Sequence, residues 1–138
     1  MYINKIKIAS LVAICGSFVF TQIAMADIAI IANPSNSYSV TEKKVKKIFL
    51  GKNDAMTPVD LSEGNTTRNA FYKKVVSKNE SQMKAYWSKM IFSGKATPPE
   101  SKSDDAGVKV WVANNQNGIG YIDSSSVDDS VKVLLTIK

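Results

Sequence analysis

Short apolar runs and longer amphipathic segments alternate along this chain, and this alternation constrains the fold more than any other feature. Residues 28–32 (IAIIA) are apolar without interruption, which is typical of a strand buried on both faces. The next segment places Val45 and Phe49 on one face of a helix, and Gly51 is suited to end that helix in a left-handed conformation. Strand-like and helix-like segments that alternate in this way predict an α/β layer fold.

The same alternation continues to the C-terminus. Further strands are expected around 59–61, 119–122 and 131–137, and further helices at 66–77, from Glu80 to 94 and from a cap at Ser103 to 117. In the helix that begins near Glu80, the apolar residues form one stripe, which predicts core packing: Met83, Tyr86, Trp87, Met90 and Ile91. Residues 95–100 predict an extended loop. The expected domain is therefore a small mixed sheet flanked by about four helices.

The first 26 residues have the pattern of a secretory signal peptide. Lys5 and Lys7 form a basic start, 8–20 is apolar, and Ala24 and Ala26 supply the small residues that precede a cleavage site. The apolar run is shorter than the stretch of about 20 residues that a membrane span needs. We expect cleavage after Ala26, export to the periplasm without a stable membrane anchor, and a single mature domain at 27–138.

The composition of the mature chain excludes several classes of function. The single cysteine, Cys15, lies in the signal peptide, and the chain has no histidine, so the usual general base, nucleophile pair and soft metal ligands are absent. The acidic loop Asp123–Asp129 lacks the spacing of a calcium site. Without Lys5 and Lys7, 16 basic residues oppose 12 acidic ones, which favours anionic partners diffusely but shows no nucleic-acid pattern. We expect a non-enzymatic protein with no cofactor and no bound metal.

The start of the helix at 66–77 is a candidate anion site. Gly64, Asn65, Thr66 and Thr67 place an amide and hydroxyls where a helix leaves backbone N–H groups unpaired, and Arg68 adds a two-pronged cation. The same residues also suit simple helix capping, so both interpretations remain open.

Two further polar segments have a role in this hypothesis. Ser35 and Ser37 follow the first strand, and they share an edge with the candidate site if the first two strands are parallel neighbours. Four lysines cluster on the first expected helix: Lys43, Lys44, Lys46 and Lys47. They form a solvated helix face, and they can also raise the local concentration of anions near the site.

An ordered set of short motifs resembles the phosphate-binding proteins of phosphate ABC transporters, within the type 2 periplasmic binding-protein superfamily. The set spans nearly the whole mature chain and consists of Ile48–Lys52, Glu63–Arg68 with Phe71, Tyr86–Trp87, Phe92–Lys95 with Pro98–Pro99, and Ile119–Tyr121. The resemblance implies an exported protein that binds phosphate or a similar oxyanion in phosphate uptake or sensing. The alternative is a structural or protein-interaction module that keeps the fold and has lost small-molecule binding.

The resemblance also implies which residues bind the ligand and what is missing. In the family, a Ser-Gly-Thr sequence at a helix start grips phosphate, and Asn65, Thr66 and Thr67 hold that place here. An arginine that the family often carries just before this turn is replaced by Leu61. Full members have two lobes that close over the ligand, and this chain resembles one. A second protein chain, or a second copy, is therefore expected to complete the site.

Overall fold

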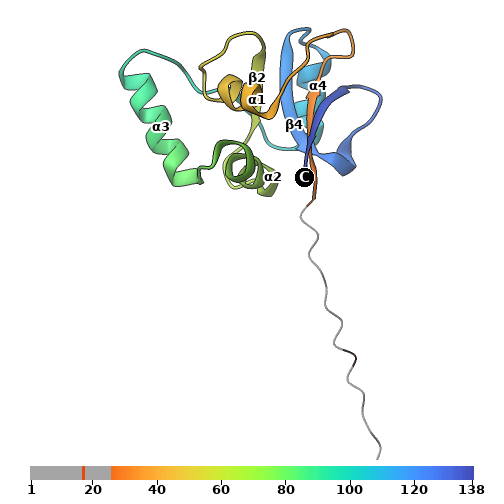
Figure 1. Ribbon diagram of the computed structural model, residues 1–138, viewed down its shortest axis with the longest axis horizontal. Coiled ribbons are helices and arrows are strands. Elements are labelled where there is room, and N and C mark those ends of the chain that lie inside the picture. Colours follow the sequence, from red (N-terminus) through yellow and green to blue (C-terminus); the bar gives the residue numbers. More distant parts are fainter. Residues whose placement is uncertain (1–16, 18–25) are drawn as a thin grey trace, which may run out of the picture.

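The computed structural model describes residue 17 and residues 26–138, so the predicted signal peptide falls almost entirely outside the described residues. Within 26–138 the chain has an open α/β fold, as the sequence predicts (Figure 1). The strands are β1 (Ile28–Ala32), β2 (Thr57–Leu61), β3 (Glu100–Lys102), β4 (Gly118–Asp123) and β5 (Lys132–Ile137). The helices are α1 (Glu42–Phe49), α2 (Thr66–Phe71), α3 (Glu80–Phe92) and α4 (Asp105–Ala113); a π-helical segment, η1 (Tyr72–Val76), continues α2, and a short 3-10 turn, η2 (Ser124–Ser126), follows β4.

The five strands form one mixed sheet in the order β3-β2-β4-β1-β5. β2 runs parallel to β3 and to β4, whereas β1 runs antiparallel to β4 and to β5. The loop expected at 95–100 is present up to Pro99, and the short strand β3 that follows it was not predicted. Its residues, Glu100 to Lys102, are polar and largely exposed, so they lack the apolar pattern by which a strand is recognised in a sequence.

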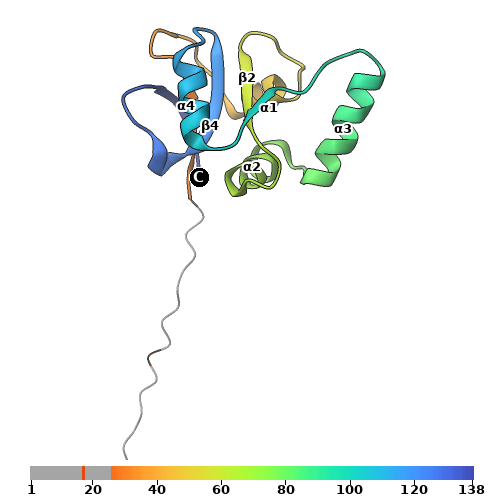
Figure 2. The same cartoon turned by 180° about the vertical axis from the view of Figure 1, so that it is seen from behind.

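Helices cover both faces of the sheet. α4 lies in front of β4 in Figure 2, while α1 lies on the far side of β2 in the same view. Gly120 lets α4 approach β4 closely, since a Cβ atom there would lie 2.8 Å from Cγ1 of Val108 and 3.0 Å from Cγ1 of Val59. Within the described residues, no helix combines the length and the apolar character that crossing a bilayer requires.

Three buried aromatic rings join α1 and α2 to the sheet. The rings of Phe71 and Tyr121 are stacked with centroids 3.8 Å apart, and Phe49 packs edge-on against Phe71 at 4.9 Å. All three side chains are fully buried. Aromatic pairs of this kind contribute about 0.5–1.5 kcal/mol beyond the area they bury. This packing holds the end of α2 against α1 and the sheet.

The apolar stripe of α3 is core for only part of its length. Met83 and Trp87 are buried, and Tyr86 and Met90 are half-buried against the core. Ile91 is 54% exposed, so its assignment to the core is wrong, and its neighbour Phe92 is 95% exposed. Figures 1 and 2 both show why, because α3 stands at the side of the domain and no helix or strand of residues 26–138 lies outside its C-terminal end.

The start of α4 is also corrected. Ser103 was expected to cap this helix, but the N-cap is Asp104, whose Oδ1 accepts the backbone N–H of Gly107 at 2.8 Å. By contrast, α1 begins at the expected place, where the hydroxyl of Thr41 accepts the N–H of Lys44 at 3.3 Å. Gly51 follows α1 with φ at 71°, the left-handed conformation that its sequence position predicts.

Candidate functional site

The turn between β2 and α2 presents a capped helix start. Asn65 is the N-cap, and its Oδ1 accepts the backbone N–H groups of Thr67 at 2.9 Å and Arg68 at 3.2 Å. Gly64 precedes it with φ at 83°, a conformation that a residue with a Cβ atom rarely adopts. Two of the N–H groups that an anion could use are therefore already bonded to a side-chain oxygen.

Other donors at this turn have no protein partner among the described residues. These are the hydroxyls of Thr66 and Thr67 and the backbone N–H of Gly64. Thr66 is exposed and Thr67 is half-buried, so a ligand in solvent can reach the first directly. Donors at the positive end of a helix favour an anion, and hydroxyls suit any oxyanion.

Arg68 is largely occupied by protein groups. Its Nη1 donates to the carbonyl oxygen of Leu61 at 2.7 Å and lies 3.2 Å from Oδ2 of Asp60, while its Nε lies 3.3 Å from Oε1 of Glu80. Burial lowers the pKa of the guanidinium, but attraction to Asp60 and its other neighbours outweighs burial and raises the pKa overall. Arg68 thus joins α2 to β2 and to the start of α3. Its Nη2 makes no hydrogen bond or ion pair within residues 26–138 and remains available to a ligand.

Asp60 lies at the centre of this polar cluster. Its carboxylate is 3% exposed and accepts the backbone N–H of Leu61 at 2.8 Å, the hydroxyl of Tyr72 at 2.5 Å, and the hydroxyl of Tyr121. Burial raises the pKa of the Asp60 carboxyl, against the opposing effects of Arg68 and the two tyrosine hydroxyls. Burial and the same carboxylate raise the pKa of Tyr72 and of Tyr121. Both phenols therefore stay protonated and remain donors.

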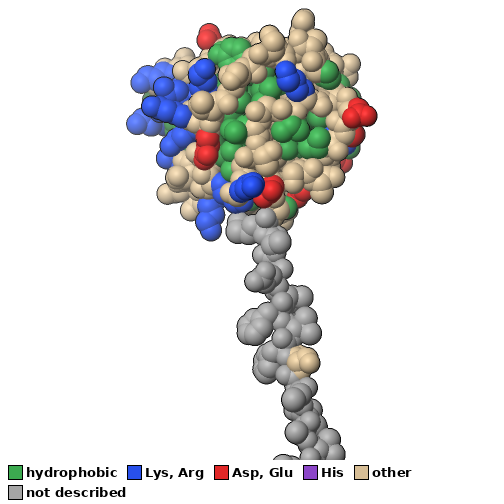
Figure 3. Space-filling model, turned by 45° about the vertical axis from the view of Figure 1, so that its right-hand side comes forward, with side chains coloured by type: hydrophobic (Ala, Val, Ile, Leu, Met, Phe, Trp, Pro, Cys, Tyr) green, Lys and Arg blue, Asp and Glu red, His purple; other side chains and the backbone are tan. Residues whose placement is uncertain are grey.

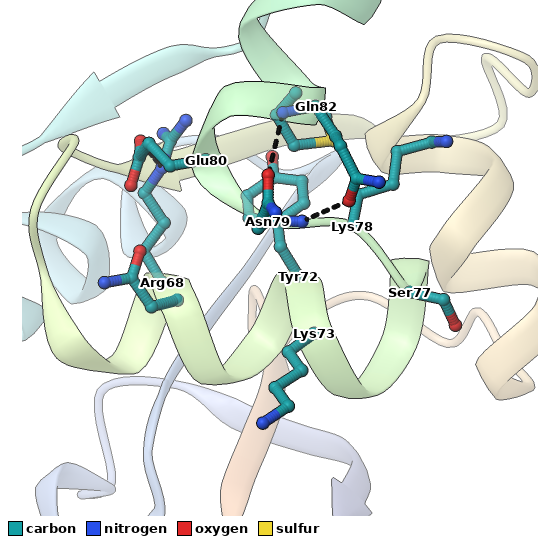
Figure 4. A pocket seen from close by; sticks show the side chains of 10 residues that line it. Arg68, Tyr72, Lys73, Ser77, Lys78, Asn79, Glu80 and Gln82 are labelled. Carbon is teal, nitrogen blue, oxygen red and sulfur yellow. Dashed lines mark hydrogen bonds and ion pairs between the residues drawn. The ribbon is translucent and has the colours of Figure 1, made fainter.

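A hollow of about 670 Å³ lies beside this cluster, between η1 and the start of α3. Figure 4 shows Arg68 and Glu80 at one side of it and Lys78 at the other. Its wall includes Ser77, which has a left-handed conformation with φ at 61° although it is not glycine. Of the predicted site residues, Arg68 lines this hollow, whereas Gly64 to Thr67 lie outside it.

Ser35 and Ser37 lie at the end of the sheet where β4 begins, whereas the turn after β2 lies at the end where β4 finishes. This corrects the hypothesis that both turns lie at the same end of the strands. That hypothesis required β1 and β2 to be parallel neighbours, but β4 lies between them and β1 runs antiparallel to β4. The end of β1 pairs with the start of β4, since Ala32 lies opposite Ile119, whereas β2 runs parallel to β4. The two turns are therefore separated by the length of the strands (Figure 1).

At their own end of the sheet, Ser35 and Ser37 line a shallow hollow of about 370 Å³ with residues that follow α4. The hydroxyl of Ser35 donates to Oδ1 of Asn33 at 2.7 Å, and Nδ2 of Asn33 donates to the carbonyl oxygen of Ala113 at 2.9 Å. These bonds tie the turn to the end of α4. Among the described residues, no cluster of three or more potential metal-ligating side chains occurs.

The fold matches somewhat less than half of the length of several solved proteins that are described as phosphate transport or binding proteins, or as candidates for that role. A candidate phosphate ABC transporter substrate-binding protein from Clostridium perfringens, described with bound phosphate, is 28% identical with a TM-score of 0.59. The match covers 79% of this chain and 45% of that protein. The chain has the fold of one lobe of a phosphate ABC transporter substrate-binding protein. The resemblance that the sequence motifs indicate is thereby confirmed at the level of the fold.

Two further structures share this lobe at lower identity. An ABC-type phosphate transport receptor from Vibrio cholerae has a TM-score of 0.61 at 20% identity, with 79% of this chain and 46% of that protein covered. A possible phosphate binding protein from Planctomyces limnophilus has a TM-score of 0.50 at 13% identity, covering 72% and 37%. The chain thus spans less than half the length of these proteins. It matches no protein-family model and no curated protein.

The buried part of the polar cluster in this lobe was not predicted as part of the site. Asp60, Tyr72 and Tyr121 are not among the ligand-binding residues that the sequence predicts. One signal was present in the sequence: Asp60 interrupts the apolar run between Val59 and Leu61. A carboxylate in a strand that is otherwise buried needs partners, and this need points to a polar network.

Proposed function

We propose that this protein binds phosphate, or an oxyanion of similar size and charge, at the turn between β2 and α2. The observation that carries the proposal is the match of 79% of the chain, at 28% identity, to a protein described with bound phosphate. The local chemistry supports it, because Thr66, Thr67 and Gly64 offer donors at a helix start that have no partner within residues 26–138.

The proposed binding is weak for the isolated chain. Two N–H groups of the helix start are bonded to Asn65, and the charge of Arg68 is balanced by Asp60 and Glu80. The turn is also open to solvent, where charge-assisted hydrogen bonds contribute less than in an enclosed site. A second protein chain, or a second copy, would supply the opposing wall, as the half-length match to the two-lobed proteins suggests.

We further propose that the protein acts in the periplasm, in phosphate uptake or sensing, after export and cleavage at Ala26. The pattern of the first 26 residues and the names of the structural neighbours support this proposal. Sequencing the N-terminus of the protein purified from a periplasmic extract tests the export step. A mature protein that still begins at Met1 would contradict it.

Titration calorimetry of the mature chain with phosphate and with sulfate tests the binding site. Thr67→Ala is the main variant, because the hydroxyl of Thr67 makes no hydrogen bond to the part of the chain that the structure describes, while its backbone N–H is bonded to Asn65. Loss of one hydrogen bond to an anion should weaken binding by about 10- to 100-fold. Ser37→Ala, at the opposite end of the sheet, is the matched control and should bind as the unmodified protein does.

Arg68→Ala is interpreted only with a parallel unfolding measurement, because Arg68 also holds the fold together. No heat at millimolar phosphate with a folded mature chain would refute binding by the isolated lobe. In that case a saturable protein partner in a periplasmic pull-down would favour the interaction-module alternative.

A further inference from the structure

Lysines from two distant parts of the sequence meet on one side of the domain. α1 packs against η1, and Phe49 of α1 also contacts Phe71 at the end of α2. Lysines lie on α1, on η1 and just after η1. We call this group the α1–η1 lysine surface, and it consists of Lys43, Lys44, Lys46, Lys47, Lys73, Lys74 and Lys78. Figure 3 shows basic side chains gathered on one side of the molecule, at the left of that view. The sequence alone indicated only the group on α1.

These seven lysines have no acidic partner among the described residues. Other lysines do, since Lys84 pairs with Glu63 at 3.2 Å and Lys109 pairs with Asp128 at 2.8 Å. Within α1 and η1, one residue is acidic, Glu42 in the first turn of α1. The surface therefore carries a large uncompensated positive charge, which raises the local concentration of anions.

The packing of α1 keeps its lysines in place. Val45, Ile48 and Phe49 are buried, so the helix cannot turn its polar face toward the core. Lys43, Lys44 and Lys47 are exposed, away from these buried residues. The charge is thus presented on a rigid element, on a helix face that is free of buried contacts.

The chemistry of the surface fits a layer of anionic headgroups better than a specific protein epitope. The charges of this surface are lysine ammonium groups, which are flexible, strongly hydrated point charges. The aromatic residue beside the lysines of α1 is Tyr38, which is 37% exposed and has Nζ of Lys44 5.6 Å from its ring centroid. Tyrosine is common at membrane interfaces as well as at protein interfaces. Clusters of four to eight lysines on an amphipathic helix are typical of binding to anionic lipid.

We propose that the α1–η1 lysine surface holds this protein against an anionic lipid bilayer. Each lysine near such a surface strengthens binding by about five-fold at low salt. The attraction decays over about 10 Å at 0.1 M salt, so binding should weaken steeply as salt is added. This proposal is independent of the oxyanion site, because the turn at Gly64 to Thr67 contributes no lysine to the surface.

Sedimentation with vesicles tests the proposal. The mature chain should sediment with vesicles that contain phosphatidylglycerol and should stay in solution with vesicles of phosphatidylcholine alone. The triple variant Lys43→Gln/Lys44→Gln/Lys47→Gln should lose on the order of 100-fold in apparent affinity. Lys73→Gln/Lys74→Gln should lose on the order of 10-fold, which tests whether η1 contributes. Glutamine keeps the helix propensity of lysine, so these variants should fold.

The matched control has the same change in net charge. Lys95→Gln/Lys132→Gln/Lys138→Gln removes three exposed lysines outside the surface and should lose no more than about two-fold. Equal binding to both kinds of vesicle, or equal losses in the two triple variants, would overturn the proposal. Binding to soluble poly-glutamate without binding to phosphatidylglycerol vesicles would also overturn it, in favour of an acidic protein partner.

Discussion

Replacing Arg68 by methionine separates a structural role from a ligand-binding role for this residue. The side chain is 12% exposed and contacts Asp60, Glu80 and the carbonyl oxygen of Leu61. Methionine keeps much of the length but leaves the carboxylate of Asp60, which is 3% exposed, without its counter-charge. Breaking a buried ion pair from one side costs about 3–5 kcal/mol. For a domain of this size, that corresponds to a fall in Tm of about 12–20 °C.

Urea unfolding followed by tryptophan fluorescence measures the loss, since Trp87 and Trp111 report from α3 and α4. The matched control is Lys84→Met, because Lys84 and Glu63 form an exposed pair, at 63% and 56% exposure, which contributes about 0–1 kcal/mol. Combining Arg68→Met with Asp60→Asn should cost at least about 1 kcal/mol less than the sum of the single changes.

The deficit of Arg68→Met should also depend on pH. Burial raises the pKa of folded Asp60 above 3.8 and Arg68 opposes this rise, so removing Arg68 raises the pKa further. A raised pKa favours the protonated carboxyl in the folded state, and its stabilising effect is lost as pH rises through the folded-state pKa. The deficit should therefore be larger at about pH 7 than at about pH 4. A loss below about 1 kcal/mol, or additive single changes, would refute the structural role of Arg68.

Two further predictions concern the core and the helix caps. Phe71→Ala should lower the free energy of unfolding by about 3–5 kcal/mol in urea, because it removes a buried, stacked ring. Phe92 is 95% exposed, so Phe92→Ala should change this free energy by less than about 0.5 kcal/mol. Similar losses in the two variants would contradict the packing. Asp104→Ala should cost about 1 kcal/mol and Ser103→Ala almost nothing in thermal melts. A larger loss for Ser103→Ala than for Asp104→Ala would show that Ser103 caps α4.

Local patterns were sufficient for most of the elements. The uninterrupted apolar run of β1, the helical spacing of Val45 and Phe49, and the left-handed Gly51 each predicted what the structure contains. β3 was missed because its pairing with β2 comes from the sheet and not from its own polar residues. Ile91 was misplaced because helical periodicity identifies an apolar face but cannot show whether another element covers it.

The candidate site shows the same division. Asn65, Thr66 and Thr67 could be recognised as a helix start from the sequence, because capping depends on neighbouring residues. The partners of Arg68 could not, since Asp60 and Glu80 reach it only after β2, α2 and α3 have packed. The separation of Ser35 and Ser37 from this turn likewise followed from the insertion of β4 between β1 and β2.

The sequence by itself determined most of the alternation of elements, the starts of α1, α2 and α3, and the likeness to a phosphate-binding lobe, because these depend on contacts between near neighbours in the chain. Only the tertiary structure decided that Arg68 is held in a buried ion pair, that the two serines lie at the far end of the sheet, and that the lysines of α1 and η1 share one surface. These features depend on strand order and on which helix covers which face. Such choices are set by packing across the whole sheet, and periodicity within a segment does not reveal them.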